Sequence, residues 1–129
     1  MSWIQTYTGR CFHSLEPKVE DVFIEDIAHA LALTCRYTGH CLTFYSVAQH
    51  SIGVAVAVAK EFGYYATLLA TGALPGDVQR WLRTALLHDA AEAYLADVAR
   101  PVKRLLGEGY REVERRLEKV VANKFDLIY

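Results

Sequence analysis

The stretch LLHDAAE at residues 86–92 places a histidine and an aspartate next to each other inside an apolar, helix-forming segment. The surrounding periodicity predicts a helix from residue 78 to about residue 95, with one shared stripe formed by Trp81, Ala85, His88 and Glu92. At ~3.6 residues per turn, neighbouring side chains point about 100° apart, so His88 and Asp89 can still reach one ion above the groove between them. An imidazole beside a carboxylate suits divalent transition metals, and we therefore expect a metal site here.

A third ligand has to come from elsewhere in the chain, because two protein ligands rarely hold an ion. His50 is the best donor, since it lies on the apolar face of a helix expected over residues 47–62, where an unpartnered ring would be costly. Ser46 and Gln49 have the spacing of a capping box that starts this helix. We expect His50 to join the His-Asp pair in binding a divalent metal ion, with Mn, Co, Mg, Zn and Fe as the candidates.

Three further side chains are candidates for catalysis or substrate binding. Glu92 lies four residues after His88 on the expected helix, where a carboxylate one turn from a metal can deprotonate an attacking water. Asp97 follows just past the expected helix end and could position water or protonate a leaving group. Arg36 could hold a phosphate through its bidentate fork.

Each of these side chains also has a purely structural interpretation. His50 could be a satisfied core histidine, and the adjacent His-Asp pair could be a solvated carboxylate beside a buried ring. Glu92 could face solvent and pair with Arg100. Arg36 could be a helix-end cation that offsets the helix dipole. A zincin helix is excluded, because that motif requires H-E-x-x-H and the run here is H-D-x-x-E.

The rest of the chain predicts an all-α bundle with one short N-terminal β-hairpin. Residues 3–12 alternate loosely around the turn signal Thr8-Gly9, which favours the hairpin. Apolar spacing predicts three further helices. The first starts near Glu25 or Asp26 and ends before Gly39. The second is short and begins at Pro101, and the third covers residues 110–124, separated from the second by Gly107 and Gly109. Residues 64–75 are apolar but fit either a short helix or a packed loop.

Length and composition place the chain among single-domain globular proteins. It has 129 residues, of which 53% are hydrophobic, and a formal net charge of -1, so the basic surface typical of nucleic-acid binders is not expected. Three cysteines without a CxxC spacing argue against a disulfide scaffold and for a reducing cytoplasm. There is no secretory signal and no apolar run long enough to span a bilayer. We expect a cytoplasmic protein without membrane or nucleic-acid partners, and a homo-oligomer is an open alternative.

Four segments resemble the HD-domain metal-dependent phosphohydrolases, in particular the branch of 5'-deoxynucleotidases and small phage or bacterial deoxynucleotide hydrolases. They are DIAHAL (26–31), CRYTGH (35–40), FYSVAQHS (44–51) and LHDAAEAY (87–94), the last continuing through Asp97 to the PVK of residues 101–103. The resemblance spans nearly the whole chain. It implies one HD-type phosphohydrolase domain over residues 1–129.

The resemblance also implies a role for each candidate. Under it, His50 is the first metal histidine, His88 and Asp89 are the HD pair, Glu92 activates water, Asp97 is a further acidic residue near the substrate, and Arg36 lies near the phosphate. The implied activity is metal-dependent hydrolysis of a nucleotide phosphate, with a deoxynucleotide as the expected substrate. Two alternatives stay open: a non-catalytic helical binding module with an incomplete HD site, and an HD hydrolase of a cyclic nucleotide or an alarmone.

The chain departs from the family's pattern in one respect. The family usually supplies a fourth metal ligand, an aspartate on a helix beyond the last one expected here. Asp126 comes too early in the chain and in the wrong context to match it. We therefore expect either a chain truncated at its C-terminus or a site completed by water or by a neighbouring subunit.

Overall fold

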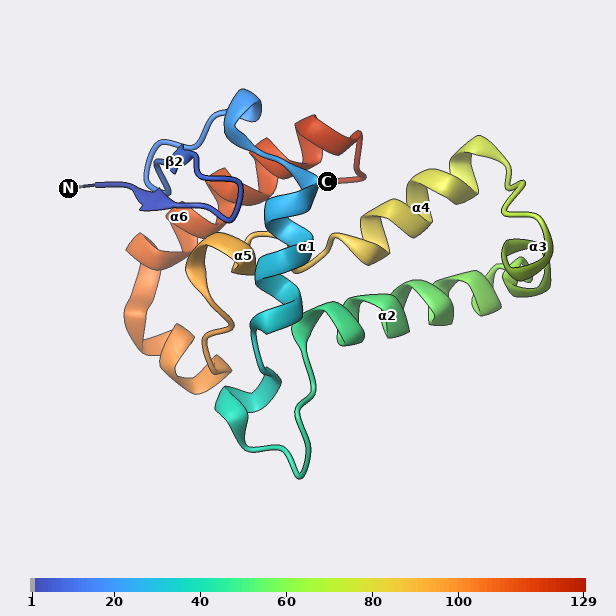
Figure 1. Ribbon diagram of the computed structural model, residues 1–129, viewed down its shortest axis with the longest axis horizontal. Helices are drawn as coiled ribbons and strands as arrows, with labels where there is room; N and C mark the ends of the chain where they lie inside the picture. Colours follow the sequence, from blue (N-terminus) through green and yellow to red (C-terminus); the bar gives the residue numbers. More distant parts are fainter. Residues whose placement is uncertain (1) are drawn as a thin grey trace.

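The computed structural model describes residues 2–129 and is mostly helical, with one two-stranded antiparallel hairpin at the N-terminus (Figure 1). The hairpin pairs β1 (Ile4–Gln5) with β2 (Cys11–Phe12), which confirms the hairpin prediction. The helical elements are η1 (Val19–Asp21), α1 (Ile24–Leu33), η2 (Arg36–Gly39), α2 (Val47–Glu61), α3 (Tyr65–Ala70), α4 (Gly76–Leu86), α5 (Glu92–Leu95) and α6 (Arg100–Phe125). This architecture agrees with the expected all-α class. Within residues 2–129, no helix combines the length and apolar character needed to cross a membrane.

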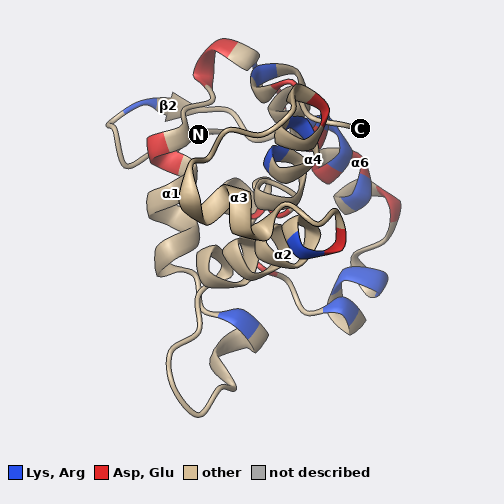
Figure 2. Ribbon diagram, turned by 90° about the vertical axis from the view of Figure 1, so that its right-hand side faces the viewer, with Lys and Arg blue, Asp and Glu red and all other residues tan. Residues whose placement is uncertain are grey.

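Helix α1 stands between two groups of elements. On one side α2 and α4 pack against each other and are joined through α3, and on the other side lie the hairpin and α6 (Figure 1). The central core contains Phe12, Val22, Ile27, Leu31, Val47, Leu87, Tyr94, Leu117 and Val121, and a smaller cluster around Ala59, Val78 and Leu82 joins α2 to α4. Charged residues are spread along α4 and α6, whereas α1 and α2 are uncharged over most of their length (Figure 2). The charged residues of α1 and α2 lie only at helix ends, so the parts of these two helices that meet each other are uncharged apart from Asp26.

Asp26 ties the N-terminal hairpin to α1. The residue is only 3% exposed, and its carboxylate accepts hydrogen bonds from the Thr8 backbone N–H at 2.8 Å and the Thr8 hydroxyl at 3.0 Å. It lies in the first turn of α1, where a carboxylate also offsets the positive end of the helix dipole. The acidic helix start predicted from the sequence therefore also anchors the turn of the hairpin.

The predicted capping box at the start of α2 is present. The Gln49 N–H donates to the Ser46 hydroxyl at 3.0 Å, and the Ser46 N–H donates to the Gln49 side-chain oxygen at 2.8 Å. Both bonds satisfy donors that the first turn of a helix leaves without backbone partners. Because His50 belongs to this turn, the capping box also determines where its ring emerges.

The prediction of one helix from residue 78 to about residue 95 is wrong. Helix α4 ends at Leu86, residues 87–91 form successive turns, and the short α5 follows. At this point the imidazole Nδ1 of His88 lies 2.7 Å from the Ala85 carbonyl, the group that would accept from the Asp89 N–H in a continuing helix, so a side-chain contact accompanies the change to turns. His88, Asp89 and Glu92 therefore do not share one helical stripe, and the first two lie in a turn.

Two other helix ends differ from the sequence prediction. Helix α1 ends at Leu33 rather than just before Gly39, because Cys35 pairs with Ser46 in an isolated antiparallel bridge, and the residues between form a loop that contains the short η2. The break predicted at two glycines of α6 occurs at Gly107 alone, whose φ of 72° and ψ of -158° are accessible to glycine. The ambiguous residues 64–75 contain a short helix, α3.

Truncation of Leu117 tests the central core. Its side chain is 0% exposed, so Leu117→Ala should lower the free energy of unfolding by about 2–5 kcal/mol, through lost burial and the cavity left behind. The matched control is Leu105→Ala on the same helix, where the side chain is 89% exposed and the expected change is within about 0.5 kcal/mol. Urea denaturation of both variants measures the two values, and equal losses would contradict this core.

Candidate metal centre

Three potential metal ligands converge although they come from two segments. His50 projects from the first turn of α2, and His88 and Asp89 project from the turn that follows α4. One Asp89 carboxylate oxygen, Oδ2, lies 3.0 Å from the His88 Nε2 and 3.5 Å from the His50 Nε2, and all three ligand atoms lie within 4.8 Å of one another. Atoms that each lie ~2.1 Å from a shared ion are separated by about 3–4 Å, so this spacing fits a common ion.

The hydrogen bond of the His88 ring decides which nitrogen faces the site. The ring Nδ1 lies 2.7 Å from the Ala85 carbonyl oxygen, and since a carbonyl only accepts, Nδ1 carries the proton. In the neutral ring, Nε2 then presents its lone pair toward Asp89. A backbone carbonyl that orients a histidine in this way is a common feature of metal sites in proteins.

The ionisation of the three groups favours one hydrogen-bonded pair beside a neutral ring. The hydrogen bond with Asp89 raises the pKa of His88 above its ordinary value. Burial alone would raise the pKa of Asp89, but the hydrogen bond from His88 and the nearby cations outweigh it and lower that pKa. Burial, followed by the charge of Arg36, lowers the pKa of His50. A cation has to displace the proton of His88 Nε2, so its binding should strengthen as the pH rises.

Glu92 is a half-buried acid with one buried oxygen that lacks a partner. Its Oε2 is inaccessible to solvent and has no hydrogen bond among the described residues. Burial first, and then the negative charges of Asp89 and Asp97, raise the pKa of Glu92 to about 8. In residues 2–129 no ion pair joins Glu92 to Arg100, so the solvent-facing interpretation of Glu92 is not what the structure shows. A half-buried carboxyl with a raised pKa, in the same cleft as two histidines, is suited to proton transfer.

Arg36 reaches the same place from the loop after α1. Its Nη1 lies 3.6 Å from the Asp97 Oδ2 and 3.9 Å from the Asp89 Oδ2, while its Nε is buried without a partner. Both separations exceed the ~2.7–3.2 Å of a direct hydrogen bond, so the guanidinium keeps donors for another acceptor. Arg36 is thus not simply a cation at the end of α1, because that helix ends three residues earlier, at Leu33.

All six residues predicted for the site line one cleft of about 820 Å³. Its lining comprises Arg36, Tyr37, Thr38, His40, His50, His88, Asp89, Glu92, Asp97, Val98, Ala99, Arg100, Pro101 and Lys103. The sequence prediction did not assign Tyr37, His40 or Arg100 to the site. These residues lie on a loop and at a helix start, where no hydrophobic period marks a face, and only their position in space brings them to the cleft.

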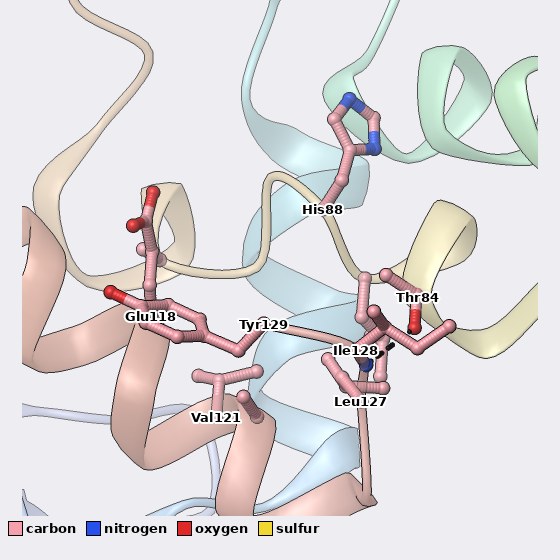
Figure 3. A pocket seen from close by; sticks show the side chains of 10 residues that line it. Thr84, His88, Glu118, Val121, Leu127, Ile128 and Tyr129 are labelled. Carbon is pink, nitrogen blue, oxygen red and sulfur yellow. Dashed lines mark hydrogen bonds between the residues drawn. The ribbon is translucent and has the colours of Figure 1, made fainter. Parts of the chain in front are cut away.

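A smaller cavity of about 190 Å³ lies on the other side of His88, between the turn after α4, α6 and the C-terminal residues 127–129. Leu127 and Ile128 line this cavity, and Figure 3 shows that the His88 ring points away from both. There the Ile128 N–H donates to the Thr84 hydroxyl at 2.9 Å. The ligating face of His88 therefore belongs to the large cleft and not to this cavity.

Asp126 is engaged elsewhere, as its early position in the sequence predicted. It caps α6 in a left-handed conformation and lies 3.4 Å from the guanidinium groups of both Arg80 and Arg83. The three ligands of the candidate centre are therefore His50, His88 and Asp89, with no contribution from Asp126.

Comparison with known proteins gives two relatives. The chain is 35% identical over 127 residues to the uncharacterized protein YfdR of Escherichia coli K12, covering 98% of this chain and 60% of that protein. It is 39% identical over 128 residues to the uncharacterized protein RCAP_rcc00048 of Rhodobacter capsulatus, covering 98% of this chain and 59% of that protein. The chain thus spans about three fifths of the length of these relatives. No protein-family model matches the chain.

The raised pKa of Glu92 should be visible in the pH dependence of stability. Between its ordinary value of 4.5 and about 8, the folded protein binds more protons at this carboxyl than the unfolded chain does, so the free energy of unfolding falls as the pH rises. Glu92→Gln removes this contribution, so the free energy of unfolding of the variant should fall less than that of the wild type between about pH 5 and about pH 8. Urea denaturation in EDTA measures the two slopes.

The assignment to Glu92 can be checked by NMR of the side-chain carboxyl carbon, whose resonance should be missing in Glu92→Gln. Asp97→Asn should move the titration of that resonance to lower pH, because one of the negative charges that raise the pKa is gone. Equal pH slopes in wild type and Glu92→Gln, with a Glu92 titration near pH 4.5, would contradict the assignment.

Proposed function

We propose that this chain carries an HD-type, metal-dependent phosphohydrolase site that hydrolyses a nucleotide phosphate, with a deoxynucleotide as the expected substrate. One observation carries the proposal. Two imidazole nitrogens and one carboxylate oxygen meet at a cleft that also contains an acid with a raised pKa and a guanidinium with free donors. The cleft is large enough for a small-molecule substrate, since ligand sites are typically ~300–1,000 Å³. We also propose a cytoplasmic location, which fits a nucleotide substrate.

The donor set fits a divalent metal. His50, His88 and Asp89 would hold the ion, and a mixed set of nitrogen and oxygen ligands suits Mn, Co, Zn or Fe better than Mg. The orphaned Oε2 of Glu92 lies in the same cleft without a partner, as expected for a group whose partner is a ligand or water. The three protein ligands leave positions for water and substrate, as catalytic metal sites require.

The charges of the side chains in the cleft suggest a different role for each of them. When bound, the metal supplies a Lewis acid that polarises a phosphoryl oxygen and makes a nearby water more acidic. Glu92 accepts the proton of the attacking water, since its carboxyl lies in the same cleft as the three ligands. Arg36 holds the phosphate through its free donors, and Asp97 positions the guanidinium. Glu92 can then return the proton to the leaving oxygen.

The sequence resemblance supports the same proposal independently of the geometry. The segments FYSVAQHS and LHDAAEAY, which resemble those of HD-domain phosphohydrolases, contain all three proposed ligands and Glu92. The printed names of the two relatives assign no activity, so the proposal depends on the residues of this chain.

The proposal is tested by metal content and turnover measured together. Wild-type protein should retain a divalent metal and release phosphate or triphosphate in a screen of ribo- and deoxynucleotides with Mn, Co, Mg and Zn each supplied. His88→Ala should lose both the metal and the turnover, because a site with three protein ligands does not easily lose one. The control is His29→Ala, whose exposed ring stacks on Tyr7 away from the cleft and which should keep both. Metal undiminished in His88→Ala would contradict the proposed centre.

The same screen distinguishes the general base, Glu92, from the three metal ligands. Glu92→Gln should keep the metal but lower the turnover by roughly 10²–10⁴-fold, since a neutral amide cannot accept the proton. Metal binding without turnover in the wild type, across all nucleotides, would favour the non-catalytic binding module. Full turnover in Glu92→Gln would move the base role away from Glu92.

The phosphate role of Arg36 predicts a loss in substrate handling. Arg36→Ala should lower kcat/KM by roughly 10- to 100-fold, since a charge-assisted bidentate contact is worth on the order of 1.5–3 kcal/mol. Arg36→Lys should recover only part, because a point charge cannot reproduce the planar fork. Arg104→Ala, at an exposed arginine outside the cleft lining, should leave kcat/KM unchanged. Steady-state kinetics beside a thermal melt measure this, and an Arg36→Ala protein with full kcat/KM would refute the role.

A further inference from the structure

Two half-buried cysteines enclose the loop that carries Arg36. The Sγ atoms of Cys35 and Cys41 lie 3.9 Å apart, and neither is in a disulfide. The Cys41 thiol donates a hydrogen bond to the Arg36 backbone carbonyl at 3.2 Å. The residues between the two cysteines include Arg36, Tyr37, Thr38 and His40, and all four line the cleft. The thiol pair is therefore in direct contact with the proposed phosphate-binding loop.

The backbone of the loop brings the two thiols together. The base of the loop is closed by two hydrogen bonds, from the Arg36 N–H to the Tyr45 carbonyl at 2.8 Å and from the Val47 N–H to the Thr34 carbonyl at 2.9 Å. Above this base, Tyr37 and Thr38 both have a φ of 56°, a left-handed conformation that non-glycine residues rarely adopt. This reversal folds the chain back so that residue 41 returns to residue 35. The proximity is thus a property of the loop fold.

We infer that Cys35 and Cys41 form a redox modification site, in which a low-molecular-weight disulfide oxidises the two thiols to an intramolecular disulfide and thereby alters the position of Arg36 in the cleft. The formation of the disulfide stands on the thiol geometry alone. Its effect on phosphate binding rests on the proposed function of Arg36. The third cysteine, Cys11, is exposed on β2 and takes no part.

The reaction balances as two thiol–disulfide exchanges. The thiolate of one cysteine attacks one sulfur of the small disulfide, whose S–S bond breaks and releases one small thiolate, leaving a mixed disulfide on the protein. The thiolate of the second cysteine then attacks the protein sulfur of the mixed disulfide, forms the Cys35–Cys41 bond and releases the second small thiolate. The protein loses two protons and two electrons, and the small disulfide is reduced to two thiols that take up the two protons.

Oxidation changes the loop in two ways. The sulfur atoms have to approach from 3.9 Å to the ~2.05 Å of a disulfide bond, which draws residue 41 toward residue 35. The Cys41 thiol also loses its proton and can no longer donate to the Arg36 carbonyl. Because both changes act on the backbone of Arg36, its guanidinium should move relative to Asp97, and its hold on a phosphate should weaken.

The first measurement asks whether the disulfide forms. The full chain is incubated in mixtures of oxidised and reduced glutathione, free thiols are alkylated, and peptides are mapped by mass spectrometry. A Cys35–Cys41 linkage, about 2 Da lighter than the dithiol because two hydrogens are lost, is expected in wild type and in the Cys11→Ser control, and it should be reversed by dithiothreitol. Cys35→Ser and Cys41→Ser should not form it. Alkylation of both Cys35 and Cys41 after full oxidation with glutathione disulfide would overturn the site.

The second measurement asks whether the loop responds. In Cys11→Ser protein, oxidation should shift the NMR resonance of the Arg36 Nε–H, assigned through Arg36→Lys, and should weaken the binding of inorganic phosphate by on the order of threefold or more. Cys35→Ser protein should show neither change under the same conditions. An unshifted Arg36 resonance in fully oxidised protein would overturn the coupling. A shifted resonance in a protein that binds no phosphate in either state would support the coupling and count against the proposed function instead.

Discussion

The hydrogen bond between the His88 Nδ1–H and the Ala85 carbonyl is the interaction on which the candidate metal centre depends. It forms where α4 ends, at the carbonyl that the Asp89 N–H would use in a continuing helix. It also holds the proton on Nδ1 and directs Nε2 toward Asp89. This contact orients the His88 ring in the turn after α4, where His88 and Asp89 face the same point although they are consecutive in sequence.

The second constraint is the balance of charge in the cleft. Three carboxyl groups, those of Asp89, Glu92 and Asp97, line the cleft together with the cationic side chains of Arg36, Arg100 and Lys103. At Glu92, burial and the negative charges of Asp89 and Asp97 outweigh the opposing charges of Lys103 and Arg36 and raise the pKa to about 8. A bound divalent cation would offset part of the negative charge around Glu92.

The packing of apolar residues brings the two histidines of the site together. The capping box at Ser46 sets the start of α2, and the core residues Val47 and Leu87, both buried, hold α2 and the turn after α4 in one apolar cluster. His50 and His88 flank these positions and are carried to within 5.2 Å of each other, measured between ring centres. The polar site is therefore positioned by the apolar residues beside its ligands.

The local features of the fold could be predicted because each depends on residues close in sequence. The hairpin around Thr8, the capping box of Ser46 with Gln49, and the break at Gly107 all follow from the conformational preference or hydrogen-bonding capacity of a few neighbours. The end of α4 could not be predicted in this way, because the spacing of apolar residues is the same for a continuous helix and for a helix followed by tight turns. In the structure the turns are marked by i→i+3 backbone hydrogen bonds, such as those from Ala90 to Leu87 and from Glu92 to Asp89, and by the contact of His88 with Ala85.

The sequence by itself determined which residues can bind a metal, move a proton or hold an anion, since these capacities belong to the side chains and the short segments around them. Only the tertiary structure decided that Arg36 meets Asp97, that Glu92 is buried enough for a pKa of about 8, and that Cys41 returns to Cys35. The physical reason is that burial, charge interaction and thiol proximity depend on distances between segments. Those distances are set by how the apolar faces of the helices pack and by the left-handed turn of a loop, and neither is visible in the spacing of residues along the chain.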